Sequence, residues 1–130
     1  MMAGELRYLS AQPERNFSQA VQAGDFLFVS GQVGQVTGGT DPGPQDFRAQ
    51  ADSALGRLVE AVVSAGGRPS DIVALRAFLA DASYYTEYVE AKNHALGEAC
   101  PSGTVVVAEL LRSSLLIEVE AIAYIPPVAD

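Results

Sequence analysis

Only two stretches of this 130-residue chain place apolar residues at the three- and four-residue spacing of a helix. The first is expected to begin at Pro44, with Gly43 as a possible cap, and to end at Gly66-Gly67. The second follows Asp81 and ends before Pro101, because the residue that precedes a proline disfavours helix. Two helices can cover only one face of a sheet, so this pattern limits the fold more than any other feature.

Six short runs of β-favouring residues surround the helical stretches, and each is expected to form a strand: Leu6–Leu9, Phe17–Gln22, Phe26–Ser30, Ile72–Ala80, Thr104–Leu110 and Leu115–Ile125. A turn at residues 111–114 joins the last two, and the Gly- and Pro-rich residues 34–44 are expected to form a surface loop. The order β-β-β-α-β-α-β-β predicts an α+β fold, with two helices on one face of a mixed sheet, in a single domain spanning residues 1–130.

Two of these strands, Phe26–Val29 and Leu115–Ile122, are rich in apolar residues at both inward- and outward-facing positions. Strands of this kind are expected to be buried on both faces of a sheet. The helices cover one face only, so a second copy of the chain is expected to cover the other. The apolar fraction of 48% provides enough side chains for such an interface.

The charge of the chain bears on its partners and its location. Sixteen acidic residues against eight basic ones give a formal net charge of −8, the wrong sign for binding nucleic acid. No apolar run approaches the roughly 20 residues that span a bilayer, so no membrane partner is expected. The first residues resemble neither a secretory signal nor a transit peptide, and a cytoplasmic location is expected.

The residues that most often bind metals or act as nucleophiles are scarce. With Cys100 and His94 as the single cysteine and histidine, no zinc site can form from these two residue types, and no metal is expected. His94 lies opposite Tyr85 on its helix and is expected to face solvent. Cys100 is expected to be a small apolar filler at the helix end.

Two carboxylates suggest proton transfer. Glu118 and Glu120 lie two residues apart on one strand, so their side chains share a face at a separation of about 6.6 Å. In an apolar strand at least one of them is expected to have a raised pKa, as a proton-transfer group requires. The alternative is an ion pair with Arg76 or Arg112, and the spacing does not decide between the two.

A further polar group stands at the end of an expected buried strand. Ser30 and Gly31 could hold a carbonyl oxygen or a water molecule with a hydroxyl and a backbone N–H.

Six motifs, in order along residues 15–125 and without large gaps, carry a resemblance to a known family: Phe17-Ser18-Gln19-Ala20-Val21, Gly24-Asp25, Phe28-Val29-Ser30-Gly31-Gln32, Ala65-Gly66-Gly67 with Asp71-Ile72-Val73, Asp81, and Ile117-Glu118-Val119-Glu120-Ala121-Ile122-Ala123. They resemble the Rid family of reactive intermediate deaminases, also called the YjgF or L-PSP endoribonuclease family. The resemblance implies a chorismate-mutase-like fold of the bacillus type and a homotrimer with three clefts between subunits. It also implies cofactor-free hydrolysis of small enamines and imines to a 2-oxo acid and ammonia.

The chain departs from this family where the resemblance implies substrate binding. In the family a Pro-Ala-Arg-Ser motif supplies an arginine that binds the substrate carboxylate. Here the motif is Pro101-Ser102-Gly103-Thr104, with Gly103 at the arginine position. Phe17, Val89 and Val105 stand where the family has Tyr, Asn and Cys.

The resemblance implies that three residues hold and polarise the attacking water, and all three are retained in this chain. They are Ser30, Gly31 and Glu118, the candidate catalytic residues. The candidate substrate-binding residues are Phe17, Val89, Gly103, Thr104 and Val105.

These departures favour a Rid-like hydrolase or deaminase for a neutral imine, enamine or similar labile molecule over one for amino-acid-derived imines. Burying a substrate carboxylate without a cationic partner costs free energy. Arg76, Lys92 or Arg112 could instead take the place of the missing arginine as that partner. A trimeric protein that binds a small ligand, or acts as a chaperone, without catalysis is the alternative. Endoribonuclease or translation-inhibitor activity ranks last because of the acidic charge.

Overall fold

The order of elements in the computed structural model, which describes residues 6–34 and 46–126, is β-β-β-α-β-α-β-β, as predicted. The elements are β1 (Leu6–Gln12), β2 (Phe17–Ala23), β3 (Phe26–Val33), α1 (Phe47–Ser64), β4 (Ile72–Leu79), α2 (Tyr85–Leu96), β5 (Ser102–Val107) and β6 (Ile117–Tyr124). Apart from Gly34 itself, the loop expected at residues 34–44 lies outside the described residues.

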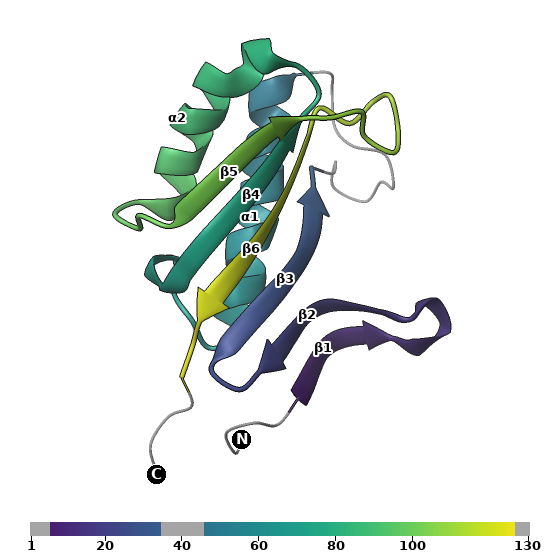
Figure 1. Ribbon diagram of the computed structural model, residues 1–130, viewed down its shortest axis with the longest axis vertical. Coiled ribbons are helices and arrows are strands. Elements are labelled where there is room, and N and C mark those ends of the chain that lie inside the picture. Colours follow the sequence, from purple (N-terminus) through teal and green to yellow (C-terminus); the bar gives the residue numbers. More distant parts are fainter. Residues whose placement is uncertain (1–5, 35–45, 127–130) are drawn as a thin grey trace.

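The strands form one mixed sheet in the order β1-β2-β3-β6-β4-β5, and both helices pack on the same face of it (Figure 1). Neighbouring strands are antiparallel except β4 and β5, which run parallel and are connected through α2. The α+β prediction is therefore confirmed. Although the expected turn at residues 111–114 suggests a hairpin, β5 and β6 are not neighbours, because β6 pairs with β3 and β4 in the middle of the sheet.

Helix α1 supplies most of the core beneath the sheet. Its cap is Asp46, which accepts a hydrogen bond from the Arg48 N–H at 3.0 Å, so the helix begins three residues after the predicted start at Pro44. Gly66, with φ of 96°, follows its end as predicted. The predicted apolar stripe is buried, apart from the half-buried Ala65: Phe47, Ala51, Ala54, Leu55, Leu58 and Val62.

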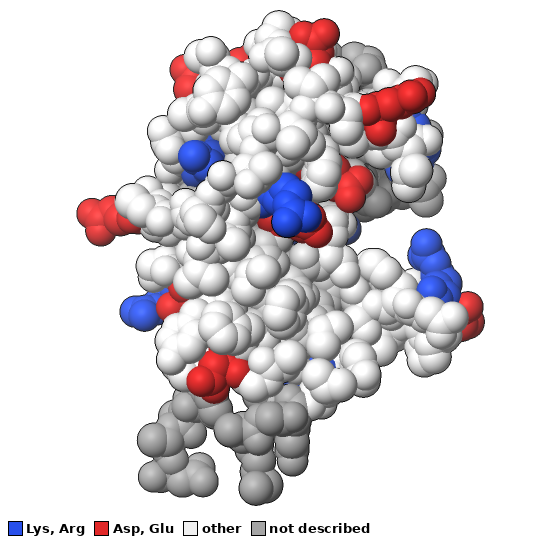
Figure 2. All heavy atoms as spheres, viewed as in Figure 1, with Lys and Arg blue, Asp and Glu red and all other residues white. Residues whose placement is uncertain are grey.

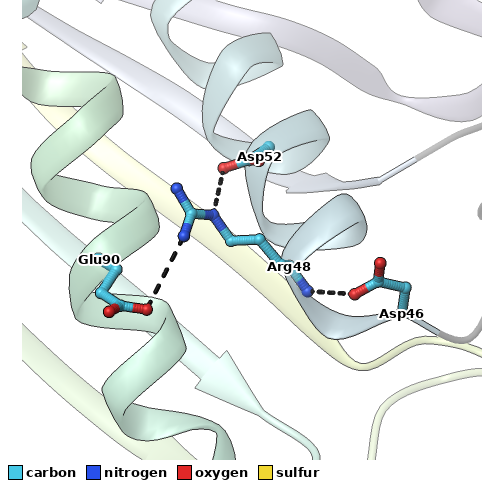
Figure 3. Close-up of polar contacts among 4 residues, drawn as sticks. All are labelled: Asp46, Arg48, Asp52 and Glu90. Atoms are coloured by element: carbon cyan, nitrogen blue, oxygen red, sulfur yellow. Dashed lines mark hydrogen bonds and ion pairs between the residues drawn. The ribbon is translucent and has the colours of Figure 1, made fainter.

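Arg48 also links the two helices (Figure 3). Its Nε contacts Asp52 Oδ1 at 3.0 Å on α1, and its Nη1 lies 3.8 Å from Glu90 Oε1 on α2. All three side chains are more than a third exposed, and exposed ion pairs contribute less than about 1 kcal/mol. The helices are therefore held to the sheet and to each other mainly by apolar burial.

A buried glutamine ties α1 to the loop that leads into β6. Gln50 is 1% exposed, and its Oε1 accepts a hydrogen bond from the Leu116 N–H at 2.9 Å. Its Nε2 donates to the Ser114 carbonyl at 2.9 Å. The amide side chain thus takes the place of a sheet neighbour just before β6 begins.

The sheet face opposite the helices, here called the open face, has no cover within one chain. In β3, Leu27 and Val29 are buried against the helices, whereas Phe26 and Phe28 on the other side are 43% and 46% exposed. The expectation that this strand is buried on both faces is therefore wrong for the single chain. Figure 2 shows the open face as mostly uncharged surface.

Helix α2 buries only part of its surface, and the expectation for Cys100 at its end needs correction. Tyr85 is 54% exposed and does not share the buried face with Tyr88, which is 2% exposed. Cys100 is exposed and does not fill the core. Lys92 extends over the Tyr88 ring, with its Nζ 5.9 Å from the ring centroid. Within the described residues, no helix has the length and apolar character to cross a membrane.

Candidate functional site

Gly31 and Glu118 meet on the open face at an irregularity between two central strands. The pairing of β3 with β6 shifts register between Val29 and Gln32, as in a β-bulge. A Cβ atom added at Gly31 would collide with the Glu118 carboxylate oxygen Oε2. The Glu118 carboxyl group therefore lies directly over the Gly31 backbone, and a residue with a side chain would displace it.

Ser30 is held in place by the backbone of β2. Its Oγ donates a hydrogen bond to the Ser18 carbonyl at 2.7 Å, which leaves the hydroxyl oxygen as an acceptor. The side chain of Gln32, which is 3% exposed, donates to the Ser30 carbonyl at 2.9 Å and accepts from Gln19 at 3.3 Å. These hydrogen bonds fix the backbone around the bulge.

The two carboxylates of β6 have different surroundings. Glu120 lies beside Arg76 on β4 and accepts a hydrogen bond from Arg76 Nη1 at 3.1 Å. Glu118 lies beside Phe78, and burial raises the pKa of its carboxyl group above the ordinary value, with the Glu120 charge as a second, smaller cause. Glu118 therefore fits the expectation of a raised pKa, and Glu120 fits the alternative of an ion pair with Arg76.

A pocket of about 350 Å³ opens on the same face, between the central strands and the edge strand β5. Phe28 and Ile122 form part of its apolar lining, whereas Arg76, Glu120 and Thr104 provide polar groups. The backbone of Gly103 also lines it. Glu118 is two residues from Glu120 along β6 and lies outside the lining.

The candidate residues do not form one cleft within a single chain. Thr104 pairs with Arg76 and shares the open face with it. Gly103 and Val105 pair with Leu75 and Ala77, whose side chains are buried on the helix side of the sheet.

The other two candidate substrate-binding residues lie apart from the pocket. Val89 is on α2 and packs against the core, on the helix side. Phe17 begins β2, opposite Gln12, and is 41% exposed.

The three cations that could replace the missing arginine lie in different places. Arg76 lines the pocket. Lys92 lies on the helix side over Tyr88, and Arg112 belongs to the segment between β5 and β6.

Sequence reasoning missed Phe28 and Ile122 as pocket residues. Strand pairing alone identifies them, because Phe28 pairs with Ile122, which also pairs with Ala74 in the pocket. In the described part of the chain, no three His, Cys, Asp or Glu residues cluster closely enough to hold a metal ion.

These elements define an α+β protein of chorismate-mutase-like architecture, with a partly desolvated carboxyl group over a glycine bulge. The chain belongs to the endoribonuclease L-PSP family, whose model matches residues 9–125. This is the Rid or YjgF family that the sequence motifs indicate.

Three similar proteins illustrate the relationship. The RutC family protein YjgH of Escherichia coli is 31% identical over 118 residues, which cover 90% of this chain and 88% of that protein. A 2-iminobutanoate/2-iminopropanoate deaminase of Dermatophagoides farinae is 28% identical over 118 residues, covering 90% and 91%. The crystal structure of a Mycobacterium tuberculosis member of the YjgF family matches with a TM-score of 0.80 and 28% identity, covering 93% of this chain and all of that one.

Proposed function

We propose that this protein is a cytoplasmic, cofactor-independent hydrolase of small imines or enamines, with Glu118 as the group that moves protons. The observation that carries the proposal is the Glu118 carboxyl group, which lies over Gly31 with a raised pKa. A carboxyl group whose pKa is closer to neutrality both accepts and returns a proton more readily at physiological pH. The deaminase among the similar proteins supports the same reaction class.

In this reaction a water molecule adds to the imine carbon, and Glu118 takes one of its protons. Glu118 delivers this proton to the imine nitrogen, which gives a neutral carbinolamine with a new C–O bond. Glu118 then takes the hydroxyl proton and passes it to the amino nitrogen, so the C–N bond breaks as the C=O double bond forms. The products are a carbonyl compound and ammonia. Ser30 accepts a hydrogen bond from the water, and the Gly31 N–H donates to the developing negative charge.

The proposed substrate is neutral, because Gly103 stands where family members have a carboxylate-binding arginine. Guanidinium groups bind carboxylates through two parallel hydrogen bonds, and a glycine offers none. Arg76 lines the pocket but is paired with Glu120, so it does not provide an unopposed positive charge.

The proposed active form is a homotrimer with clefts between subunits. The exposed apolar side chains of the open face, among them Phe28 and Tyr124, favour a second copy as the cover. The resemblance to the Rid family, with its clefts between subunits, supports an arrangement in which Gly103 and Val89 of one copy lie near Glu118 of another.

Restoring the arginine tests this proposal. A Cβ atom at Gly103 meets nothing nearer than the Leu75 carbonyl oxygen at 3.8 Å, so a side chain fits there. We expect Gly103→Arg to raise the hydrolysis of 2-iminobutanoate, generated in the assay and followed by 2-oxobutanoate formation, by about tenfold or more, since hydrogen bonds to charged groups contribute roughly 1.5–3 kcal/mol. Gly103→Leu, which adds bulk without charge, should give no gain.

Adding Glu118→Gln to the Gly103→Arg variant should remove the gained activity. A double variant as active as Gly103→Arg would contradict the role of Glu118. Binding of the imine without turnover in every variant would instead favour the non-catalytic ligand-binding alternative.

A further inference from the structure

Ser30 and Gly31 lie at the irregular part of β3. The register with β6 changes between Val29 and Gln32, and among the described strands neither Ser30 nor Gly31 pairs with a residue of β2 or β6. A bulge of this kind disrupts the ladder of hydrogen bonds, so the ladder alone does not set the direction of the Ser30–Gly31 peptide. The N–H of this peptide is the donor proposed above for the developing negative charge.

The buried side chain of Gln32 supplies that direction. Gln32 is 3% exposed, and its Nε2 donates a hydrogen bond to the Ser30 carbonyl oxygen at 2.9 Å. It pairs with Val119, which is buried on the helix side, so the Gln32 side chain also lies on that side of the sheet. Its contacts are made inside one chain and do not depend on what covers the open face.

Gln19 on β2 sets the orientation of the Gln32 amide. A primary amide has a donor end and an acceptor end. The Gln19 Nε2 donates to the Gln32 Oε1 at 3.3 Å. Because this contact occupies the acceptor end of the Gln32 amide, the donor end faces the Ser30 carbonyl. The two glutamines thus form a chain of hydrogen bonds from β2 to the bulge.

The Ser30 carbonyl and the Gly31 N–H belong to one planar peptide unit. In a trans peptide these two groups point in opposite directions, and the described residues contain no cis peptide bond. Since the carbonyl points to the Gln32 amide on the helix side, the N–H is directed toward the open face, where the Glu118 carboxyl group lies over Gly31. A hydrogen bond to the carbonyl also polarises the peptide, which makes its N–H a stronger donor.

We propose that Gln32 is a positioning residue of the candidate site, which directs and polarises the Gly31 N–H that donates to the developing negative charge. Gln32 acts through the Ser30–Gly31 peptide and not on the reacting atoms, because its side chain lies on the opposite side of the sheet. The inference deepens the proposed function and rests on it.

Replacing Gln32 by methionine removes both ends of the amide at a similar side-chain size. The matched control is Gln22→Met. Gln22 is 2% exposed and pairs with the buried Leu27, so it too lies on the helix side. Its Nε2 donates to the carbonyls of Gly24 and Ile125, each at 3.1 Å. Both variants lose a buried amide that binds backbone carbonyls, but only Gln32→Met loses one at the bulge.

The nitrogen-15 resonance of the Gly31 amide reports on the hydrogen bond to Ser30, because the peptide nitrogen shares electrons with that carbonyl. In the spectrum of the full chain we expect Gln32→Met to move this resonance upfield and Gln22→Met to leave it in place. An unchanged Gly31 resonance in Gln32→Met would overturn the inference, and this result needs no substrate.

Hydrolysis of 2-iminobutanoate by the Gly103→Arg protein gives a second measurement. Adding Gln32→Met should lower kcat by about tenfold or more, since loss of one oxyanion donor costs about 100- to 1,000-fold. KM should change little, because a donor to developing charge acts in the transition state. Adding Gln22→Met instead should leave kcat and KM near those of Gly103→Arg, although both additions remove buried hydrogen bonds.

The two proposals fail in different ways. If Glu118→Gln abolishes hydrolysis but Gln32→Met lowers kcat no more than Gln22→Met does, this inference is overturned and the proposed function stands. If no variant hydrolyses the imine, Gly103→Arg included, the proposed function fails, and the role of Gln32 in turnover fails with it.

Discussion

Gly31 is the residue that most directly shapes the candidate site, because the Glu118 carboxyl group occupies the space where its side chain would be. The close approach gives the carboxyl group one position over the bulge and shields it from water on that side. Part of the raised pKa of Glu118 follows from this burial.

We predict that Gly31→Ala destabilises the protein by about 1–3 kcal/mol, the usual cost of forcing extra atoms into a packed site. It should also reduce any Glu118-dependent activity, because the carboxyl group must move. Gly56→Ala is the control: Gly56 lies in α1 with open space around its Cβ position, and alanine there should stabilise the helix by about 0.5–1 kcal/mol. Urea denaturation of both variants measures the difference, and equal stabilities would contradict the close approach.

The sequence placed Glu118 and Glu120 on one face, because side chains alternate along a strand. It could not say which glutamate has a cationic neighbour. That depends on how β4 aligns with β6, and the two strands are far apart in the chain, with α2 and β5 between them. The family motifs likewise identified Gly103, but its position on the helix side follows only from its pairing with Leu75.

At the scale of elements, Gln50 shows how a polar side chain can hold two segments that are far apart in the sequence. Its amide accepts from the Leu116 N–H and donates to the Ser114 carbonyl just before β6, while the Leu116 carbonyl accepts from the Ala80 N–H. This contact holds the loop before β6 against α1.

We predict that Gln50→Ala lowers the free energy of unfolding by about 2 kcal/mol or more, because the buried Leu116 N–H loses its acceptor and a cavity forms. Glu60→Ala, at an exposed position of the same helix, should change it by less than about 0.5 kcal/mol. Thermal or urea denaturation gives both values. A loss of similar size in the two variants would show that Gln50 does not fix the loop.

The elements themselves were largely predictable from periodicity, since the apolar stripe of α1 and the six strand segments follow directly from side-chain spacing. The sequence places the start of α1 three residues too early. Proline is common at the first position of a helix, which favours Pro44, but the Asp46 side chain caps the helix instead. The place of β6 was not predictable from local pattern, since pairing with β3 and β4 depends on contacts distant in the sequence.

For the molecule as a whole, the open face is the main feature without a cover. Phe26, Phe28 and Tyr124 are each more than 40% exposed on one side of the sheet, and β5 ends in three exposed valines, Val105, Val106 and Val107. Apolar patches of this kind usually mark an interface.

We predict that the protein sediments at three times its chain mass of 13.6 kDa. Phe28→Lys should shift it toward monomer, since a charge would be buried at the interface. Val63→Lys, a change of the same kind at a 52% exposed position on α1, should leave the mass unchanged. Analytical ultracentrifugation decides the matter: a monomeric wild-type protein, or a Phe28→Lys variant that still sediments as a trimer, would refute assembly through this face.

The central place of the last strand has a consequence for biosynthesis. Since β6 separates β3 from β4, neither half of the sheet can pair with the other until residues 117–124 have left the ribosome. The edges of β3 and β4 that pair with β6 therefore stay unpaired until then, and such long-range closure is slow.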